Sequence, residues 1–512
     1  MASGQQTTDE LSGGIARARD LARRGSLQTA IGELEALARR SADPAPAIFE
    51  IGNLTKAAGL YDQAEAAFRQ VMKTYPGSIE AATNLANVLS AKGQADTAIA
   101  ILRNVQSVVQ GNAIVDISLA DALFADDRIE EALAAYDDLA ARYAGYAPVH
   151  ANRGEALARL GRHAEAIAAL DKAAALDRSN PNIVRNRAFS RLAMGDMRGG
   201  FAEYEARLNP ALATAPVRTN LTAPRWTGAL PLDGPLLVVA EQGLGDEIRF
   251  AAALPDLIAR AGDVVVECDP RLVDLLAASL PTVRVIPFDR RRDGQRPVFD
   301  YAGLPVRPAA WIEIGSLPHR LGLPGRVPMA TLGYMTPDQP RANLMRARLK
   351  AEASQRPLIG FCWGSGAGER PRQRFYPLLR DWAPVLTGLD AAFVDLQYIP
   401  SAEDRATFRD LCGVEIIDTD DLDKRNDLAT AACLAYAMDA VVGVSSSVAA
   451  MAGAVGTPTV EVTPERTWVP LVGGRDAWIG SIVAAYPDRP GDWPQAMQRA
   501  LGELKDILDP SA

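Results

Sequence analysis

The sequence predicts an α + α/β fold, in which an N-terminal α-solenoid of helix pairs precedes two α/β halves. Three observations predict it. Glycines recur at a fixed spacing of 34 residues through the first two hundred positions, and this spacing stops near Leu208. Short β-rich runs then alternate with helical segments. With 512 residues, the chain is also too long for a single core, so several domains are expected.

The repeat consists of three columns of residues. The first column is Gly25, Gly59, Gly93, Gly161 and Gly195, with Asp127 in the missing step. Five residues after each member comes a small residue: Ala30, Ala64, Ala98, Ala132, Ala166 and Gly200. Four residues further on comes a large one: Leu34, Phe68, Leu102, Tyr136, Leu170 and Tyr204. The glycine position provides the turn between the two helices of a unit. The small residue lets these helices approach closely, and the large residue fills the space between them. About six such units occupy residues 11–208.

A period of 34 residues with this pattern resembles the tetratricopeptide repeat (TPR). The resemblance implies a solenoid whose concave groove binds a peptide or a protein. A structural spacer or a self-association surface is the alternative. His150 and His163 fall inside or between the repeat helices, where we expect structural roles for them.

Composition excludes several classes of function. Hydrophobic residues make up 48% of the chain and the net charge is −9, which argues against a nucleic-acid binder with a broad basic surface. The four cysteines form no CxxC pair and the chain has three histidines, so neither a disulfide frame nor a metal centre is expected. The polar N-terminus lacks a secretory signal and no apolar run could span a bilayer. We therefore expect a soluble cytoplasmic protein.

Residues 209–232 are a predicted linker, and two similar α/β halves are expected at 233–345 and 346–512. The predicted strands are 235–240, 263–268, 283–287, 357–362, 392–396, 415–418, 440–444 and 459–462. Helices are expected at 247–260 and 270–279, and a last helix at 493–508 is expected to tie the halves together. The basic segment 290–297 is expected to be a solvated loop. A cleft between two doubly wound domains is a natural ligand site.

One stretch combines the features of an anion site. In residues 438–464 an apolar strand, 440–444, leads into Ser445, Ser446 and Ser447, and a helix of small residues follows. The serines would therefore lie at the carboxyl end of a strand and at a helix N-terminus, where exposed N–H groups bind anions. The alternative is that they only cap the helix.

Residues 226–249 read WTGALPLDGPLLVVAEQGLGDEIR, which resembles the opening of the glycosyltransferase module that follows such repeats in many bacterial proteins. That module is similar to heptosyltransferases and, more distantly, to O-linked N-acetylglucosamine transferases. The resemblance continues through GFCWGSG at 360–366, Arg374 with Pro377 and Leu378, residues 427–444, AGAVGTPT at 452–459, Trp468 and GDW at 491–493. It implies a GT-B fold of two Rossmann-like domains, the first for the acceptor and the second for the nucleotide-sugar. It also implies that helix N-termini and basic side chains replace a metal ion around the diphosphate.

The EQGLGD motif supplies the residues expected on the acceptor side. The resemblance makes Asp246 a candidate general base for the acceptor hydroxyl, and capping of the next helix is the alternative. Gly243 and Gly245 would let the backbone approach a ligand. Glu241 and Gln242 are further candidates for acceptor or sugar contacts.

The donor site is expected in the second half. The resemblance places nucleotide-sugar contacts at Trp363, Gly364, Ser365, Gly366, Arg374, Gln397, Ser445, Ser446 and Ser447. Arg374 would pair with the diphosphate, or alternatively form a surface salt bridge, and Gln397 would contact the base. The sequence departs from the family pattern at two places. Serines stand where Asp-Thr is usual, and Ala450 stands where a histidine is usual.

These observations predict a metal-independent glycosyltransferase that needs a nucleotide-sugar as co-substrate and no other cofactor. The repeat groove would recruit a protein and the cleft would transfer a sugar to a Ser or Thr hydroxyl. Flagellin is one candidate acceptor in bacteria, although no residue points to it. The alternatives are a non-catalytic scaffold with a degenerate transferase domain and a transferase acting on a glycan or lipid-linked acceptor.

Overall fold

The structure is a computed structural model that describes residues 2–241, 243–293, 296–322, 333–364, 375–399 and 401–509. It comprises two compact units. The first contains residues 1–160 and 175–177, and the second contains residues 161–174 and 178–512. The division therefore falls inside the predicted repeats.

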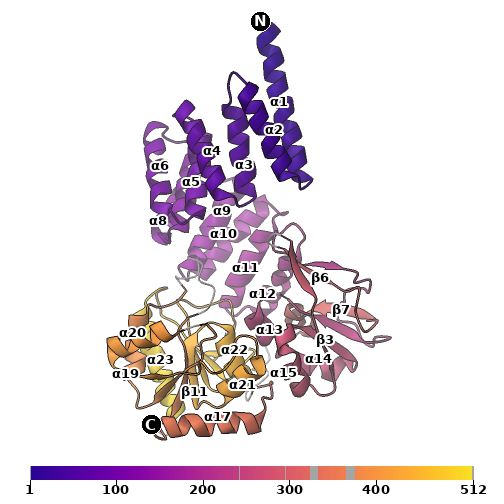
Figure 1. The fold of residues 1–512 in the computed structure, drawn as a ribbon, viewed down its shortest axis with the longest axis vertical. Helices are drawn as coiled ribbons and strands as arrows, with labels where there is room; N and C mark the ends of the chain where they lie inside the picture. The colour runs from indigo at the N-terminus through magenta and orange to yellow at the C-terminus, as the bar shows by residue number, and fades with distance from the viewer. Residues whose placement is uncertain are drawn as a thin grey trace. The chain divides into compact units, whose positions relative to one another are not determined.

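The N-terminal part of the chain is a succession of twelve described helices, each short turn leading into the next helix (Figure 1). They are α1 (Ala2–Arg23), α2 (Leu27–Arg40), α3 (Ala45–Ala57), α4 (Tyr61–Thr74), α5 (Ile79–Ala91), α6 (Ala95–Val108), α7 (Ala113–Ala125), α8 (Ile129–Arg142), α9 (Ala147–Arg159), α10 (His163–Leu176), α11 (Pro181–Ala193) and α12 (Met197–Tyr204). From α1 to α9 every helix packs on the next one in the chain, and α11 packs on α12. This confirms the predicted solenoid of helix pairs.

The glycine column forms the turns inside the helix pairs. All five glycines have positive φ angles, between 70° and 86°, and Asp127 in the missing step has φ of 63°. Glycine adopts this left-handed conformation without strain, and aspartate is among the residues that tolerate it best. The five alanines of the small column are fully buried, and so are Leu34, Phe68, Leu102 and Leu170 of the large column. Turn geometry and close packing therefore explain the repeat.

The first α/β part, here called the N-lobe, follows the 3-10 turn η1 (Glu205–Leu208) and contains two sheets. Its strands are β1 (Val217–Thr219), β2 (Leu236–Val239), β3 (Val264–Cys268), β4 (Arg284–Pro287), β5 (Arg290–Asp293), β6 (Arg296–Asp300) and β7 (Ala310–Glu313). Its helices are α13 (Leu244–Ala251), α14 (Leu254–Ala261), η2 (Pro270–Leu272), α15 (Val273–Ser279), η3 (Ile314–Ser316) and α16 (Leu317–Leu321). The main sheet is parallel with strand order β4-β3-β2-β7, and a smaller sheet has the order β1-β6-β5.

The second α/β part, the C-lobe, contains one sheet of eight described strands with the order β10-β9-β8-β11-β12-β15-β14-β13. Its strands are β8 (Leu358–Cys362), β9 (Ala392–Asp395), β10 (Ile416–Ile417), β11 (Ala440–Val444), β12 (Thr459–Val462), β13 (Leu471–Val472), β14 (Arg475–Asp476) and β15 (Ile482–Ala485). Its helices are α17 (Gln339–Glu352), η4 (Leu379–Trp382), α19 (Ala383–Thr387), α20 (Ala402–Cys412), α21 (Leu428–Tyr436), α22 (Ser447–Ala454) and α23 (Trp493–Leu508).

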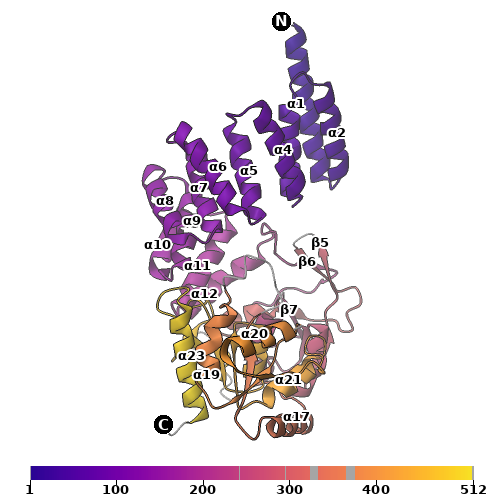
Figure 2. The same cartoon turned by 60° about the vertical axis from the view of Figure 1, so that its left-hand side comes forward.

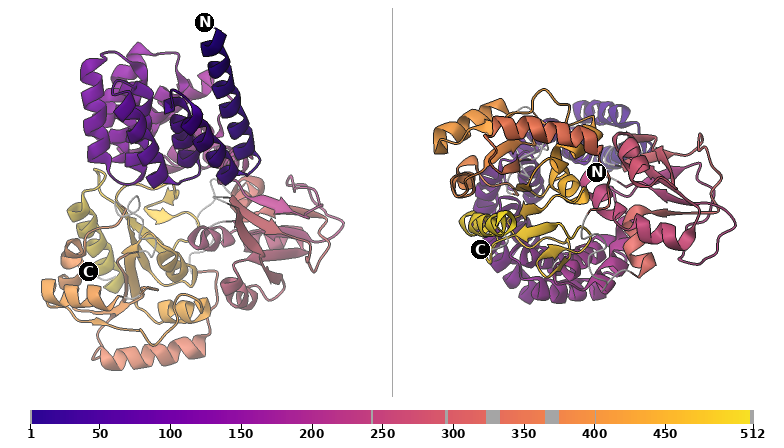
Figure 3. Two further views of the ribbon diagram at one scale, coloured as in Figure 1. Left: turned by 45° about the horizontal axis from the view of Figure 1, so that its top comes forward. Right: turned by 90° about the horizontal axis from the view of Figure 1, so that it is seen from below.

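The first six strands of the C-lobe sheet are parallel and have the order of a doubly wound nucleotide-binding fold. Helices cover both faces of this sheet. Val441 belongs to the core beneath α21 and α22, whereas Val442 and Phe361 belong to the core shared with α19 and α23. Helices α19 and α23 lie apart from α21 in Figure 2. The two lobes are built around separate sheets (Figure 3). Together with the solenoid, they confirm the predicted α + α/β class.

Four details differ from the predictions. Residues 290–293 are strand β5 and not a loop, because they pair antiparallel with β6 while all four side chains stay exposed. Residues 247–260 are split between α13 and α14, since a new helix begins at Leu254 with Pro255 in its first turn. Helix α23 packs on β11, β12 and β15 of the C-lobe, so it closes that lobe instead of tying the halves together. The expected boundary near residue 345 falls inside α17, which packs on α21.

Candidate functional site at the junction of the lobes

Each lobe has a point at which the strand order reverses, and ligands of doubly wound sheets bind outside the carboxyl ends of the strands there. In the N-lobe this point lies between β2 and β7, which lead into Glu241 and into Ser316. In the C-lobe it lies between β8 and β11, which lead into Gly364 and into the three serines. The predicted EQGLGD motif and the predicted serine turn therefore both occupy switch points.

The two lobes meet where α13 and α22 begin. A Cβ atom placed on Gly245 would lie 3.5 Å from both the N and the Cα atoms of Ser447. The N-termini of both helices, with their unpaired N–H groups and positive dipole ends, therefore lie at this junction. Gly243 just before α13 has φ of 99°, a conformation that glycine adopts without strain.

The serines of the turn have different environments. Ser446 is the N-cap of α22 and its hydroxyl accepts a hydrogen bond of 3.3 Å from the backbone N–H of Ala449. Ser445 is exposed, and Ser447 lines a cavity. The capping interpretation is therefore correct for Ser446, whereas Ser447 faces open space. Ala450, which stands where the family pattern has histidine, is fully buried in the core.

The cavity beside this junction has a volume of about 250 Å³. Leu244 and Ile248 of α13 line it from the N-lobe, and α21 and α22 give it an apolar wall that includes Leu428 and Met451. Its polar lining comes from Arg271, Tyr398, Lys424, Arg425 and Ser447. An apolar wall with a few basic and hydroxyl groups suits a ligand that has both a planar apolar part and an anionic part.

The three basic residues are held differently. Arg271 donates to both carboxylate oxygens of Asp269, and its Nη1 donates to the backbone oxygen of Arg425 at 3.0 Å, which links the lobes. Lys424 is nearly buried and its Nζ donates to Thr419 Oγ1 at 2.7 Å; burial lowers the pKa of this ammonium group. The Arg425 side chain is exposed and has no ion pair within the described part of the chain.

Asp246 lies in the first turn of α13. Burial raises the pKa of its carboxyl to about 6, and Glu241 adds to this effect while Arg249 and Arg207 oppose it. The N-cap of α13 is Gly243 and no side-chain hydrogen bond from a described residue caps this helix, although the Asp246 carboxylate in the first turn complements the helix dipole. Asp246 is about 200° around the helix from Leu244, so it lies on the face of α13 away from the cavity.

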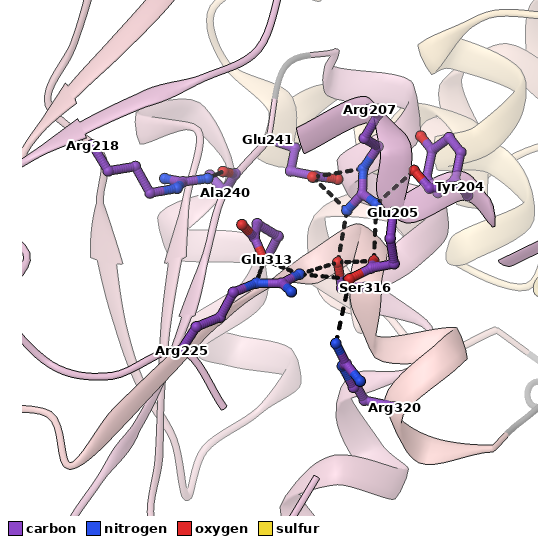
Figure 4. Close-up of polar contacts among 10 residues, drawn as sticks. All are labelled: Tyr204, Glu205, Arg207, Arg218, Arg225, Ala240, Glu241, Glu313, Ser316 and Arg320. Atoms are coloured by element: carbon purple, nitrogen blue, oxygen red, sulfur yellow. Dashed lines mark hydrogen bonds and ion pairs between the residues drawn. The ribbon is translucent and has the colours of Figure 1, made fainter. Parts of the chain in front are cut away.

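Glu241 is held by a network at the carboxyl edge of the N-lobe sheet (Figure 4). Arg207, in η1 at the end of the last repeat, donates to its Oε1 at 2.7 and 3.0 Å. Ser316 is the hub of the network, because its hydroxyl accepts from Arg207 and Arg225 and donates to Glu205. Within this network the positive charges of three arginines are balanced by the negative charges of three glutamates: Arg207, Arg225, Arg320, Glu205, Glu241 and Glu313.

Helix α13 is also fixed to the C-lobe and to the last repeat. Arg249 is buried and forms ion pairs with Glu461 of β12 and Asp476 of β14. Phe250, the residue after Arg249, belongs to an aromatic cluster. The cluster consists of Phe189, Phe201, Tyr204, Phe250, Trp468 and Trp478. Residues of α11 and α12 thus share one core with both lobes.

Two other predicted donor contacts point into the protein. The ring of Trp363 is buried and its Nε1 donates to Asp404 at 2.8 Å. The side chain of Gln397 is also buried, where its Oε1 accepts a hydrogen bond of 2.8 Å from the Cys362 thiol. Gly364 lies next to that amide. Gln242, Ser365, Gly366 and Arg374 lie outside the described residues.

The sequence arguments did not single out Arg207, Arg271, Tyr398, Lys424 or Arg425. Arg271 and Tyr398 follow the strands β3 and β9, and the carboxyl ends of strands would have been the signal. Lys424 and Arg425 form a basic pair just before the helix that leads into β11. Among the described residues, no group of His, Cys, Asp and Glu side chains could hold a metal ion, and no helix has the length and apolar character needed to cross a bilayer.

Comparisons with known proteins identify the repeats. Two family models of the tetratricopeptide repeat match residues 56–121 and 117–181. Protein FlbA of Caulobacter vibrioides is 31% identical over 340 residues, which are 63% of this chain and 54% of that protein. The chain therefore spans about half the length of this curated relative.

Solved structures of repeat proteins match about a third of the chain. A thermophilic TPR protein of Thermus thermophilus is 27% identical, with coverage of 33% of this chain and 91% of that one and a TM-score of 0.31. MamA of Desulfovibrio magneticus is 23% identical, with coverage of 34% and 97% and a TM-score of 0.29. With the family matches and the helix pairs of the structure, residues 56–181 are tetratricopeptide repeats.

Proposed function

We propose that this protein is a GT-B glycosyltransferase that moves a sugar from a nucleotide-sugar to a Ser or Thr hydroxyl of a protein recruited by the repeats. The observation that carries the proposal is the junction at which α13 and α22 begin, beside a cavity lined by Arg271, Lys424 and Arg425. Two parallel sheets contribute their switch points to this junction.

The cavity supports the donor half of the proposal. Its apolar wall suits a nucleoside, and its basic lining together with two helix N-termini suits the phosphates. A leaving nucleoside phosphate gains negative charge as the glycosidic bond to the sugar breaks, and fixed positive groups stabilise that charge. Ser447 can add a hydroxyl donor, since it lines the cavity and does not cap the helix.

Asp246 supports the acceptor half. With a pKa of about 6, its carboxylate is mostly ionised at neutral pH and still basic enough to accept a proton. In the proposed step Asp246 takes the proton of the acceptor hydroxyl, the oxygen bonds to the anomeric carbon, and the bond from that carbon to the phosphate oxygen breaks. The proton ends on Asp246 and the electron pair on the phosphate. Because Asp246 does not line the cavity, the proposed step requires the sugar to extend from the cavity past the N-terminus of α13, so that its anomeric carbon and the acceptor hydroxyl meet beside Asp246.

The test is transfer itself. The protein is incubated with a broad panel of nucleotide-sugars and with candidate acceptor proteins, flagellin among them, and intact masses are measured. One added sugar mass is expected with one donor, and Asp246→Asn should slow its appearance strongly. If the panel yields no transfer while the donors bind, the enzyme proposal is wrong.

One observation favours a non-catalytic scaffold as second candidate. Asp246 does not line the cavity, so a ligand could bind there without meeting a base. Calorimetry with the same panel separates the two, because a scaffold of this kind predicts binding of a nucleotide-sugar without transfer or hydrolysis.

A further inference from the structure

One of the links between the end of the last repeat and the N-lobe is the guanidinium group of Arg207. Arg207 uses all five of its N–H donors. Nε and Nη2 donate to Glu241, Nη2 also to Ser316, and Nη1 to Glu205 and to the backbone oxygen of Tyr204. The guanidinium also stacks 4.3 Å from the centre of the Tyr204 ring. A fully satisfied, largely buried guanidinium fixes the positions of all its partners.

Glu241 lies in the loop that leads from β2 to α13, the helix of Asp246. The other carboxylate oxygen of Glu241 packs directly against Gly315, where there is no room for a side chain. A Cβ atom at residue 315 would overlap Glu241 Oε2 and lie 3.0 Å from Arg207 Nη2. The site is therefore shaped around the Arg207–Glu241 pair, whose place in the network Figure 4 shows. A surface ion pair would not need such a fit.

We propose that Arg207 is a positioning residue that joins the last repeat to the loop of Asp246, by fixing Glu241 and neutralising its charge beside Asp246. This inference rests on the proposed function, in which Asp246 is the base. It assigns the end of the solenoid a part in the chemistry that is separate from recruiting an acceptor.

The charges around Asp246 give the proposal a specific signature. Burial raises the pKa of its carboxyl, as does Glu241 of the preceding loop, whereas the charges of Arg249 in α13 and Arg207 in η1 lower it. Its charge in turn adds to the burial that raises the pKa of Tyr204 in α12. Removing the Arg207 charge leaves an unpaired carboxylate next to Asp246, and a like charge at short range favours the protonated form. Loss of Arg207 should therefore move the acidic limb of the activity profile to higher pH.

The experiment compares Arg207→Gln, Arg225→Gln and the double variant R207Q/E241Q with the wild-type protein. Arg225 is the matched control, because it belongs to the same network but pairs with Glu205 and Glu313 and not with Glu241. In R207Q the acidic limb of the kcat profile should shift to higher pH by about one unit. At pH ~6 this shift corresponds to a kcat about fivefold lower than that of the wild type. It should stay in place in R225Q and return towards the wild-type position in R207Q/E241Q.

Hydrogen exchange measured by mass spectrometry gives a readout that needs no activity. R207Q should increase exchange in the peptide covering residues 241–249, whereas R225Q should increase it around residues 313–320. The conservative Arg207→Lys should keep the position of the acidic limb and still increase exchange, since it keeps the charge but not the five-donor geometry.

The outcomes separate the two proposals. If the wild-type protein transfers no sugar, the proposed function fails, and the exchange pattern alone decides whether Arg207 positions the loop. If transfer occurs and R207Q moves neither the acidic limb nor the exchange of residues 241–249 more than R225Q does, the positioning role is wrong.

Discussion

Gly245 of the N-lobe and Ser447 of the C-lobe are close neighbours, because a Cβ atom at position 245 would lie 3.5 Å from the backbone N and Cα atoms of the serine. This approach joins the two motifs that the sequence alone marked as functional. It also sets the width of the junction between α13 and α22, so the space available to a donor depends on a residue without a side chain.

Substitution of Gly245 should therefore depend steeply on size. Gly245→Ala adds one methyl group at an ordinary contact distance and should change donor affinity less than about threefold. Gly245→Leu must push α13 and α22 apart and should weaken donor binding by more than about tenfold. Calorimetry with the nucleotide-sugar measures both. Equal affinities for the two variants would show that the junction does not limit the donor site.

Asp246→Asn should lower the rate of transfer by about 10² to 10⁴, the usual contribution of a general base. Donor affinity should remain close to wild type, because Asp246 lies off the cavity. The exposed Asp274→Asn is the matched control and should leave the rate unchanged. A D246N protein with the wild-type rate would remove Asp246 from the mechanism.

Substitutions in the serine turn should distinguish an effect on protein stability from an effect on donor binding. Ser446→Ala removes the N-cap of α22 and should lower the free energy of unfolding by about 1 kcal/mol. Ser447→Ala removes no cap and should instead weaken donor binding, while the double variant should show both effects. Thermal unfolding and calorimetry give the two readouts. If S447A binds the donor like the wild type, the turn serves only to cap the helix.

Glu247 should make stability depend on pH. Burial raises the pKa of its carboxyl to about 8, whereas the unfolded chain has the ordinary value of about 4.3. Between these values the unfolded state loses the proton and the folded state keeps it, so stability from this group falls as pH rises from about 5 to 8. Glu247→Gln can still accept the hydrogen bond of 2.7 Å from the Asp269 backbone.

The E247Q variant should therefore gain stability relative to the wild type, on the order of 4 kcal/mol at pH ~8 and about 1 kcal/mol at pH ~5. Denaturant unfolding at both pH values measures this difference. Glu352→Gln on the exposed side of α17 is the control. A difference between E247Q and wild type that stays constant across this pH range would contradict the buried, protonated state of Glu247.

Truncation between two helix pairs, at residue 146, should succeed, and truncation at residue 207 should fail. A protein of residues 147–512 keeps α11 and α12, whose Phe201 and Tyr204 pack on Trp478 and Trp468. It should unfold in one transition and bind the donor. A protein of residues 208–512 exposes these tryptophans and leaves Glu241 without Arg207, so it should aggregate. Gel filtration and thermal unfolding decide, and two equally stable fragments would contradict the shared core.

The repeats and the parallel sheets follow from local patterns, and the sequence predicted both. The glycine column was recognisable because each turn requires a positive φ, and strands 440–444 and 459–462 have the predicted bounds because they are uniformly buried. Strand β5 escaped prediction, since four exposed side chains give no alternation.

The site was predictable only in part, because side-chain direction depends on tertiary packing. The family pattern made Ala450 look like a lost polar contact, yet this position is completely buried. Trp363 and Gln397 lie at the expected strand ends, but their side chains turn into the core. Arg207 gave no signal, because its partners Glu241 and Ser316 are 34 and 109 residues away in the chain.

The helix pairs of the solenoid differ in how freely their sequences can change. The aromatic cluster and the Arg207 network, as far as the described residues show, draw on the repeats only through α11, α12 and η1. Changes in these last helices must therefore remain compatible with both lobes. A chimaera joined between two helix pairs, at residue 146, would exchange the earlier repeats and offer a route to redirect the proposed choice of acceptor.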